Sequence, residues 1–164
     1  MIVIVMGVTG AGKTTVGRLL ADALGAEFVD ADDHHPPANV AKMRSGAPLD
    51  DADRAPWLAR LNAILRERDH AGLSVVLACS ALKAGYRIAL VEALVGARIV
   101  HLRGSPELLR ERLDTRRGHY MNPALLGSQL DTLEEPGDAI VVDISLTPAE
   151  MVRAIRFELR EAGT

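Results

Sequence analysis

The stretch GVTGAGKT, residues 7–14, carries the residue types needed to hold a phosphate. It fits the pattern G-x-x-x-x-G-K-[ST] at every fixed position and directly follows the apolar run Ile2–Met6. The glycines let the backbone curl so that successive N–H groups point inward at phosphate oxygens, and the helix that follows adds the positive end of its dipole. The pattern therefore predicts that this segment, here called the glycine loop (residues 7–15), binds ATP.

Two side chains of the glycine loop have separate predicted roles. Lys13 would reach the β- and γ-phosphates, and the hydroxyl of Thr14 would hold Mg²⁺. One alternative is a glycine-rich turn without a ligand. Another is the dinucleotide fingerprint G-x-G-x-x-G, which does not require the lysine and threonine pair. The predicted nucleotide-binding residues of the loop are Gly7, Val8, Thr9, Gly10, Ala11, Gly12, Lys13, Thr14 and Thr15.

An acidic group follows the second apolar run, in FVDADDHHP, residues 28–36. Asp30 and Asp32 are two apart, so on an extended segment their side chains point the same way. Such a carboxylate can accept a proton from a substrate hydroxyl or hold Mg²⁺. The run ending Ala78-Cys79-Ser80 has no carboxylate where a simple NTPase places its Walker B aspartate, which favours a kinase of a small alcohol over a nucleotide switch.

We assign Asp32 to the acceptor hydroxyl and Asp30 to the metal. The sequence leaves open which of the two faces the metal. A solvated acidic turn that caps the next helix is the alternative, and for Asp33 alone we favour it.

Five short, β-branched runs alternate with segments of helical spacing, which predicts one α/β domain (residues 1–164) with a parallel sheet. Two inserts are longer than a crossover requires. They are a substrate-covering insert at about residues 34–71 and a lid at about residues 116–136. The expected strands are Ile2–Met6, Glu27–Val29, Leu73–Ala78, Ala97–Leu102 and Ala139–Ile144.

Composition excludes several classes. The chain has 164 residues, a formal net charge of −3 and 3% aromatic residues, which disfavours a nucleic-acid binder. One cysteine, Cys79, allows no internal disulfide and suits a reducing, cytoplasmic setting, where we expect it to be a small buried residue. No apolar run approaches ~18 residues, so we expect no membrane span.

A longer pattern resembles a known family. The string DADDHHPPANVAKMRSGAPLDDADRAPWL, the segment CSALK with Tyr86-Arg87, and the segment Arg116, Gly118-His119-Tyr120-Met121 are similar to gluconokinases, the ATP-dependent kinases of D-gluconate. Ser128-Gln129 and TLE with Pro136 continue the match, which covers about residues 2–144. Tyr120, where phenylalanine is common, and the extra Asp33 are the departures.

The resemblance implies a five-stranded parallel sheet of order 2-3-1-4-5 with a mobile lid, similar to shikimate and nucleoside monophosphate kinases. It implies transfer of the ATP γ-phosphate to the 6-hydroxyl of D-gluconate, giving 6-phospho-D-gluconate and ADP, and a homodimer. There are two competing hypotheses: another small-molecule kinase on the same scaffold, and a nucleotide-dependent switch.

Beside this resemblance, two arginines are expected to serve the nucleotide. Arg112 and Arg116 lie four apart and so share one helix face. We expect Arg112 against the adenine and Arg116 at the phosphates on closure; two solvated arginines are the alternative. The predicted catalytic residues are therefore Lys13, Asp32 and Arg116.

Gluconate is an anion with several hydroxyls, so its pocket requires a cation and several polar groups. Lys83 and Arg87, four apart on an expected helix, could clamp the carboxylate, or could be ordinary surface cations. We expect Trp57 to anchor the core rather than contact the ligand. The predicted substrate residues are Asp32, His35, Arg54, Ser80, Lys83, Arg87 and His119.

Overall fold

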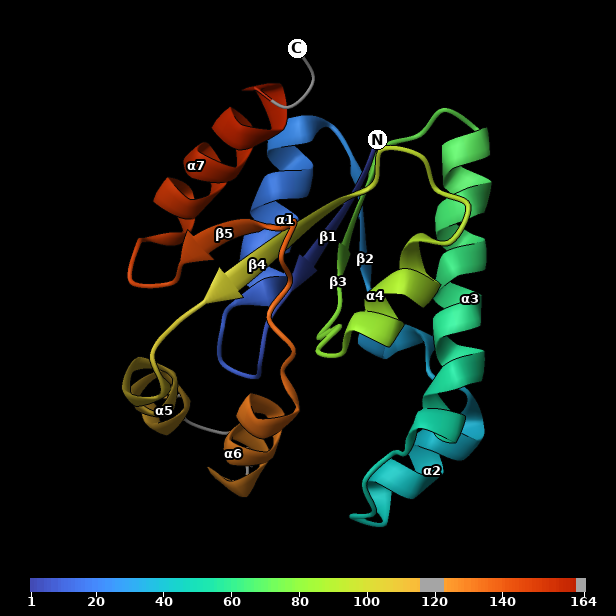
Figure 1. Ribbon diagram of the computed structural model, residues 1–164, viewed down its shortest axis with the longest axis vertical. Helices are drawn as coiled ribbons and strands as arrows, with labels where there is room; N and C mark the ends of the chain where they lie inside the picture. The colour runs from blue at the N-terminus through green and yellow to red at the C-terminus, as the bar shows by residue number, and fades with distance from the viewer. Residues whose placement is uncertain (116–122, 162–164) are drawn as a thin grey trace.

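The computed structural model describes residues 1–115 and 123–161. Helices and strands alternate along most of the chain (Figure 1). The strands are β1 (Ile2–Met6), β2 (Glu27–Asp30), β3 (Val75–Ala78), β4 (Arg98–Arg103) and β5 (Ile140–Asp143), each within two residues of its predicted bounds. The helices are α1 (Lys13–Leu24), α2 (Pro37–Arg44), α3 (Asp51–His70), α4 (Ala84–Val91), α5 (Pro106–Thr115), α6 (Pro123–Thr132) and α7 (Pro148–Glu161), with a 3₁₀ turn, η1, at Ala31–His34.

The five strands form one parallel sheet in the order β2-β3-β1-β4-β5, as predicted. β1 is central, with Val5 opposite Ala78 of β3 and Val100 of β4. All five residues of β1 are buried, which explains why its sequence is continuously apolar rather than alternating. The glycine loop and the acidic segment both follow carboxyl ends of strands, so the sheet brings them to one edge.

Two hydrophobic clusters cover the two faces of the sheet. Val3 and Val5 pack with α1 and α7, whereas Ile2, Ile4 and Met6 pack with α3 and α4. Figure 1 shows α1 and α7 on one side of the strands and α3 with α4 on the other, with α5, α6 and α2 beyond the tips of the strand arrows. The side chains that could do chemistry therefore lie at the edge of the sheet where the strands end.

The two long inserts contain helices. The first holds α2 and α3, and Pro56 lies inside α3. The second, where the sequence showed little periodicity, contains α6, which begins at a proline and buries Leu126. Among the described residues, no helix is both long enough and apolar enough to span a bilayer.

Candidate functional site

The glycine loop has the backbone geometry that its sequence predicts. Gly10 and Gly12 adopt left-handed conformations, with φ of 83° and 92°, which side chains with a Cβ rarely adopt. A Cβ at Gly7 would lie 2.9 Å from the carbonyl oxygen of Leu102, so β4 also requires glycine there. The loop can therefore keep its backbone N–H groups close to an anion at the start of α1.

Lys13 and Thr14 open α1 and extend to either side of the loop. The Lys13 ammonium donates to the Val8 carbonyl oxygen at 3.2 Å, so it lies over the loop. The Thr14 hydroxyl donates to Asp30 Oδ2 at 3.2 Å, which joins α1 to the end of β2. The structure thus brings together Thr14 and Asp30, the two residues assigned to the metal.

The Thr14 and Asp30 oxygens fit a magnesium ion. A hydroxyl and a carboxylate are hard oxygen donors, and Mg²⁺ commonly uses one or two protein oxygens together with waters and substrate phosphates. Over residues 1–115 and 123–161, no group of three or more His, Cys, Asp or Glu side chains could hold a metal by itself. A magnesium ion here would therefore depend on the nucleotide phosphates for its remaining ligands.

Asp32 differs from Asp30 although both follow β2. Asp30 Oδ1 accepts from the Asp32 backbone N–H at 3.1 Å, so Asp30 caps the η1 turn. Asp32 is open to solvent, yet the surrounding groups partly desolvate its carboxyl and raise its pKa; the charge of Asp30 adds to this rise and that of Lys13 opposes it. Solvent contact moderates the rise, so Asp32 remains an accessible carboxylate close to Lys13.

His35 and Trp57 form a stacked pair beside Asp32. Their ring centroids are 4.2 Å apart with an interplanar angle of 15°, and Trp57 Nε1 donates to the Ala31 carbonyl oxygen at 2.8 Å. Trp57 is buried, as predicted for a core anchor. Burial lowers the pKa of His35 and outweighs the opposing effect of Asp32, so His35 is neutral at pH 7.

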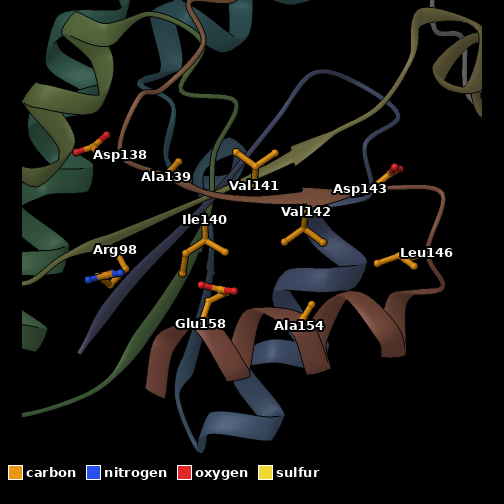
Figure 2. Close-up of a pocket in the computed structure, with 10 residues that line it drawn as sticks. All are labelled: Arg98, Asp138, Ala139, Ile140, Val141, Val142, Asp143, Leu146, Ala154 and Glu158. Atoms are coloured by element: carbon orange, nitrogen blue, oxygen red, sulfur yellow. The ribbon is translucent and has the colours of Figure 1, made fainter. Parts of the chain in front are cut away.

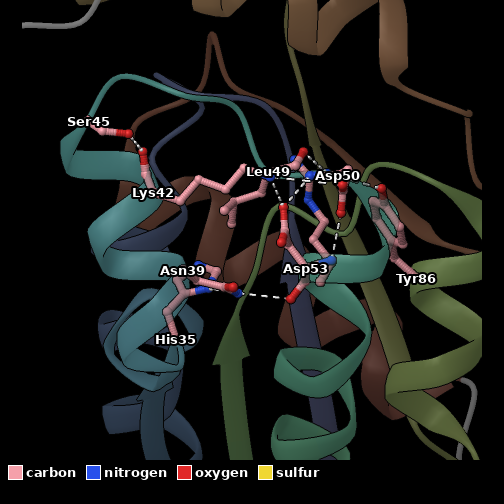
Figure 3. Close-up of polar contacts among 9 residues, drawn as sticks. His35, Asn39, Lys42, Ser45, Leu49, Asp50, Asp53 and Tyr86 are labelled. Carbon is pink, nitrogen blue, oxygen red and sulfur yellow. Dashed lines mark hydrogen bonds and ion pairs between the residues drawn. The ribbon is translucent and has the colours of Figure 1, made fainter.

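A polar network fixes the insert that carries Arg54 (Figure 3). Lys42 Nζ lies 2.5 Å from Asp53 Oδ2, and Asn39 donates to the Asp53 carbonyl oxygen at 2.9 Å. Asp50 and Asp53 form a reciprocal capping box at the start of α3. The first turn of α3, and with it Arg54, is thereby held against α2.

Arg54 points to the same side as Tyr86 of α4. Its Nη1 donates to the Leu49 carbonyl oxygen at 2.6 Å, and its guanidinium carbon lies 5.6 Å from the Tyr86 ring centroid. Lys83 Nζ pairs with the two carboxylate oxygens of Asp51 at 3.1 and 3.3 Å, and Tyr86 OH also donates to Asp51. Arg54, Lys83 and Tyr86 thus gather around one exposed carboxylate.

The structure does not bring Lys83 and Arg87 together as the expected clamp for a carboxylate. Lys83 is the N-cap of α4, whereas Arg87 is inside the helix and only 7% exposed. Arg87 Nη1 donates to the carbonyl oxygens of Ala81 and Leu82, both at 3.0 Å. The two cations therefore separate, because the backbone carbonyls of the acceptor loop (residues 79–83) bind the Arg87 guanidinium.

The other predicted site residues are Ser80, Arg112, Arg116 and His119. The Ser80 carbonyl oxygen accepts from the Gly7 N–H at 3.4 Å, so the acceptor loop adjoins the glycine loop. Arg112 donates to the Ile144 carbonyl oxygen, and its Nη1 would be 3.9 Å from a Cβ at Gly12, so it lies beside the glycine loop. Arg116 and His119 lie outside the described residues.

Cys79 is buried, as predicted. Burial raises the pKa of its thiol to about 12, so it is protonated at neutral pH and is not a nucleophile.

Sequence reasoning assigned no role to four residues that the structure places at the site. Asp51 accepts from both Lys83 and Tyr86, Gln129 contacts the glycine loop, and Glu134 contacts the start of α4. All four lie in the segments that resemble gluconokinases, so those motif matches could have pointed to these residues.

Two cavities differ in their relation to this site. One, of about 490 Å³, lies against the edge strand β5 and α7, and none of the predicted site residues lines it (Figure 2). The other, of about 360 Å³, is lined by Val8 of the glycine loop, by His101 and by Leu130 of α6, among others. Only the second adjoins the chemistry, so the first is not the active site.

Comparison with known proteins agrees with this geometry. The model of a family described as an AAA domain matches residues 2–136. A gluconokinase of Gluconobacter oxydans is 53% identical, over 82% of this chain and 76% of its own, and a probable gluconokinase of Xenopus tropicalis is 43% identical, over 97% of this chain and 93% of its own. The chain belongs to the gluconokinase family.

A solved member of the gluconokinase family extends the likeness to three dimensions. The crystal structure of a gluconokinase from Sinorhizobium meliloti 1021 is 42% identical and matches with a TM-score of 0.88, over 98% of this chain and 92% of that one. At this similarity the two proteins share the fold over nearly the whole of the described chain.

Proposed function

We propose that the protein transfers the γ-phosphoryl group of ATP to the 6-hydroxyl of D-gluconate, giving 6-phospho-D-gluconate and ADP. The observation that carries this proposal is the convergence, at one sheet edge, of a nucleotide loop with Lys13 and an accessible carboxylate, Asp32, in a chain of the gluconokinase family. A nucleotide switch would not require an accessible carboxylate, such as Asp32, beside an insert that carries polar side chains.

Each end of the reaction has its own residues. Bound Mg·ATP supplies the transferable phosphoryl group and a counter-charge for it. The glycine loop would hold the phosphates, Lys13 would neutralise charge on the transferring group, and Thr14 with Asp30 would hold the metal. Arg112, which lies beside the glycine loop, is proposed to contact the adenine, and Arg116 to reach the phosphates.

On the acceptor side, Asp32 accepts the proton from the attacking 6-hydroxyl, so its ionised form is the active one. Arg54 and Lys83 supply positive charge for the gluconate carboxylate, and neutral His35 supplies a hydrogen-bonding group. Ser80 and His119 are proposed as further substrate contacts. Arg87 acts indirectly, by fixing the acceptor loop that carries Ser80 and Lys83.

A direct assay tests the reaction. ADP release with Mg·ATP should occur with D-gluconate and stay near background with glucose, shikimate and nucleoside monophosphates. Turnover with another acceptor in place of gluconate would retain the kinase and overturn the substrate. ATP binding without turnover on any acceptor would favour a nucleotide switch.

We also propose a cytoplasmic homodimer, with ATP and Mg²⁺ as the cofactors and no nucleic-acid partner. The family resemblance supports the dimer, and the use of ATP supports the location. Sedimentation velocity would give a mass of two chains if the dimer forms and one chain if it does not.

A further inference from the structure

The segment of residues 129–135, here called the bridging segment, contacts both ligand loops. At one end, Gln129 of α6 accepts through Oε1 from the Thr9 backbone N–H at 2.6 Å. At the other end, the Glu134 backbone N–H donates to the Leu82 carbonyl oxygen at 2.8 Å, and Glu134 Oε1 accepts from the Ala84 N–H at 3.3 Å. Thr9 belongs to the glycine loop and Leu82 to the acceptor loop.

The Glu134 contact replaces a missing helix cap. Lys83 is the N-cap of α4 and its side chain makes no capping hydrogen bond. The first N–H of α4, that of Ala84, therefore receives its acceptor from a residue 50 positions away in the chain. A carboxylate at a helix N-terminus is also favoured by the helix dipole.

Both apolar packing and polar contacts hold the bridging segment in place. Leu133 packs against both hydrophobic clusters, and Glu135 Oε2 lies 3.3 Å from Nδ1 of buried His101. The cavity of about 360 Å³ is lined by Val8, Leu130 and Leu133, among others, so side chains do not fill this space. The Gln129–Thr9 hydrogen bond therefore adds a polar contact between the segment and the glycine loop beside this cavity.

We propose that Gln129 and Glu134 are positioning residues for the phosphoryl transfer. Gln129 fixes the glycine loop, Glu134 fixes the acceptor loop, and the bridging segment sets how the two loops face each other. Neither residue contacts the reacting atoms in this proposal, which rests on the proposed function.

Two matched variants separate these effects. Gln129→Met keeps the side-chain length but loses the acceptor oxygen, and should raise KM for ATP about three- to tenfold with KM for gluconate near wild type. Glu134→Met should raise KM for gluconate and leave KM for ATP near wild type. Ser128→Ala, an exposed neighbour on α6, is the control and should change neither.

Conservative variants and a ligand-free measurement complete the test. Glu134→Gln keeps an acceptor oxygen and should restore KM for gluconate. In the nucleotide-free chain, the Thr9 amide should exchange its hydrogen faster in Gln129→Met, and Gln129→Glu should restore its protection.

The proposal is overturned if Thr9 exchange and both KM values stay at wild type. It is also overturned if either variant raises both KM values together while lowering Tm, which indicates general destabilisation. Wild-type protein that fails to phosphorylate gluconate would instead refute the proposed function, because Thr9 exchange tests Gln129 without any substrate.

Discussion

Two aspartates that follow one strand differ in their surroundings at the scale of single residues. Asp30 accepts from the Thr14 hydroxyl and from the Asp32 N–H, so it is already held as an acceptor. Asp32 stays accessible, and partial desolvation with the nearby Asp30 charge raises its pKa. This difference supports Asp30 as the metal ligand and Asp32 as the base, a choice that sequence spacing left open.

Asp32→Asn should lower kcat by roughly 10²–10⁴, because the neutral amide cannot accept the proton of the 6-hydroxyl. Affinity for ATP should stay within a few-fold, which titration with a fluorescent ATP analogue would measure. A loss confined to ATP affinity, with kcat preserved, would instead assign Asp32 to the metal.

The pH dependence follows from the direction of the Asp32 shift. The ionised carboxylate is the active form, so kcat should fall as pH decreases through the raised pKa of Asp32, above the ordinary value of 3.8. A profile of kcat from pH 4 to 8 would show this acid limb. An identical limb in the residual activity of Asp32→Asn would assign it to another group.

Lys13→Ala should lower kcat by at least about a hundredfold, because it removes the cation that lies over the glycine loop and is proposed to neutralise charge on the transferring phosphoryl group. Steady-state kinetics would measure the loss, with Arg18→Ala, an exposed residue of the same helix, as the control. Unchanged turnover in Lys13→Ala would remove the catalytic role.

The positions of the site residues relative to one another were predictable where the motif is contiguous. The glycine loop, Thr14 and Asp30 lie in short segments whose spacing fixes their geometry. Arg87 was not predictable, because its burial depends on two carbonyl groups that the loop after β3 exposes only once folded.

At the scale of elements, α3 positions the acceptor side. Trp57 reaches from α3 to the Ala31 carbonyl, next to Asp32, while its ring supports His35. The helix therefore fixes η1 as well as covering one face of the sheet.

Trp57→Phe should test this link. Phenylalanine keeps a smaller apolar ring in the core and loses the bond to Ala31, so we expect a loss of at least about 1 kcal/mol in the free energy of unfolding. Urea denaturation would measure it, and KM for gluconate should rise. Trp57→Ala, which also leaves a cavity, should cost about 3–5 kcal/mol. Equal stability of Trp57→Phe and wild type would show that the Ala31 bond contributes nothing.

The strands were predictable to within two residues because each is a short apolar run that must be buried on both faces. The helix α6 was not, because the stretch PALLGSQLDT buries few side chains and contains Gly127, so its apolar spacing is weak. Its contact with the glycine loop joins residues 120 positions apart, which no local pattern indicates.

At the scale of the whole molecule, the parallel sheet brings both ligand loops to one edge. The glycine loop follows β1 and the acceptor loop follows β3, two strands that are neighbours in the sheet. The strand order came from the family resemblance, since alternation of strands and helices predicts a parallel sheet but not its order. The fold thus explains why the proposed ATP and gluconate sites can adjoin each other.

The most direct test of the central claim is to identify the product by ³¹P and ¹³C NMR after reaction of D-gluconate with Mg·ATP. We predict one ADP for each 6-phospho-D-gluconate, with phosphorus coupled to carbon 6 alone. ADP formation without phosphorylated gluconate, or a phosphate on another carbon, would contradict the account.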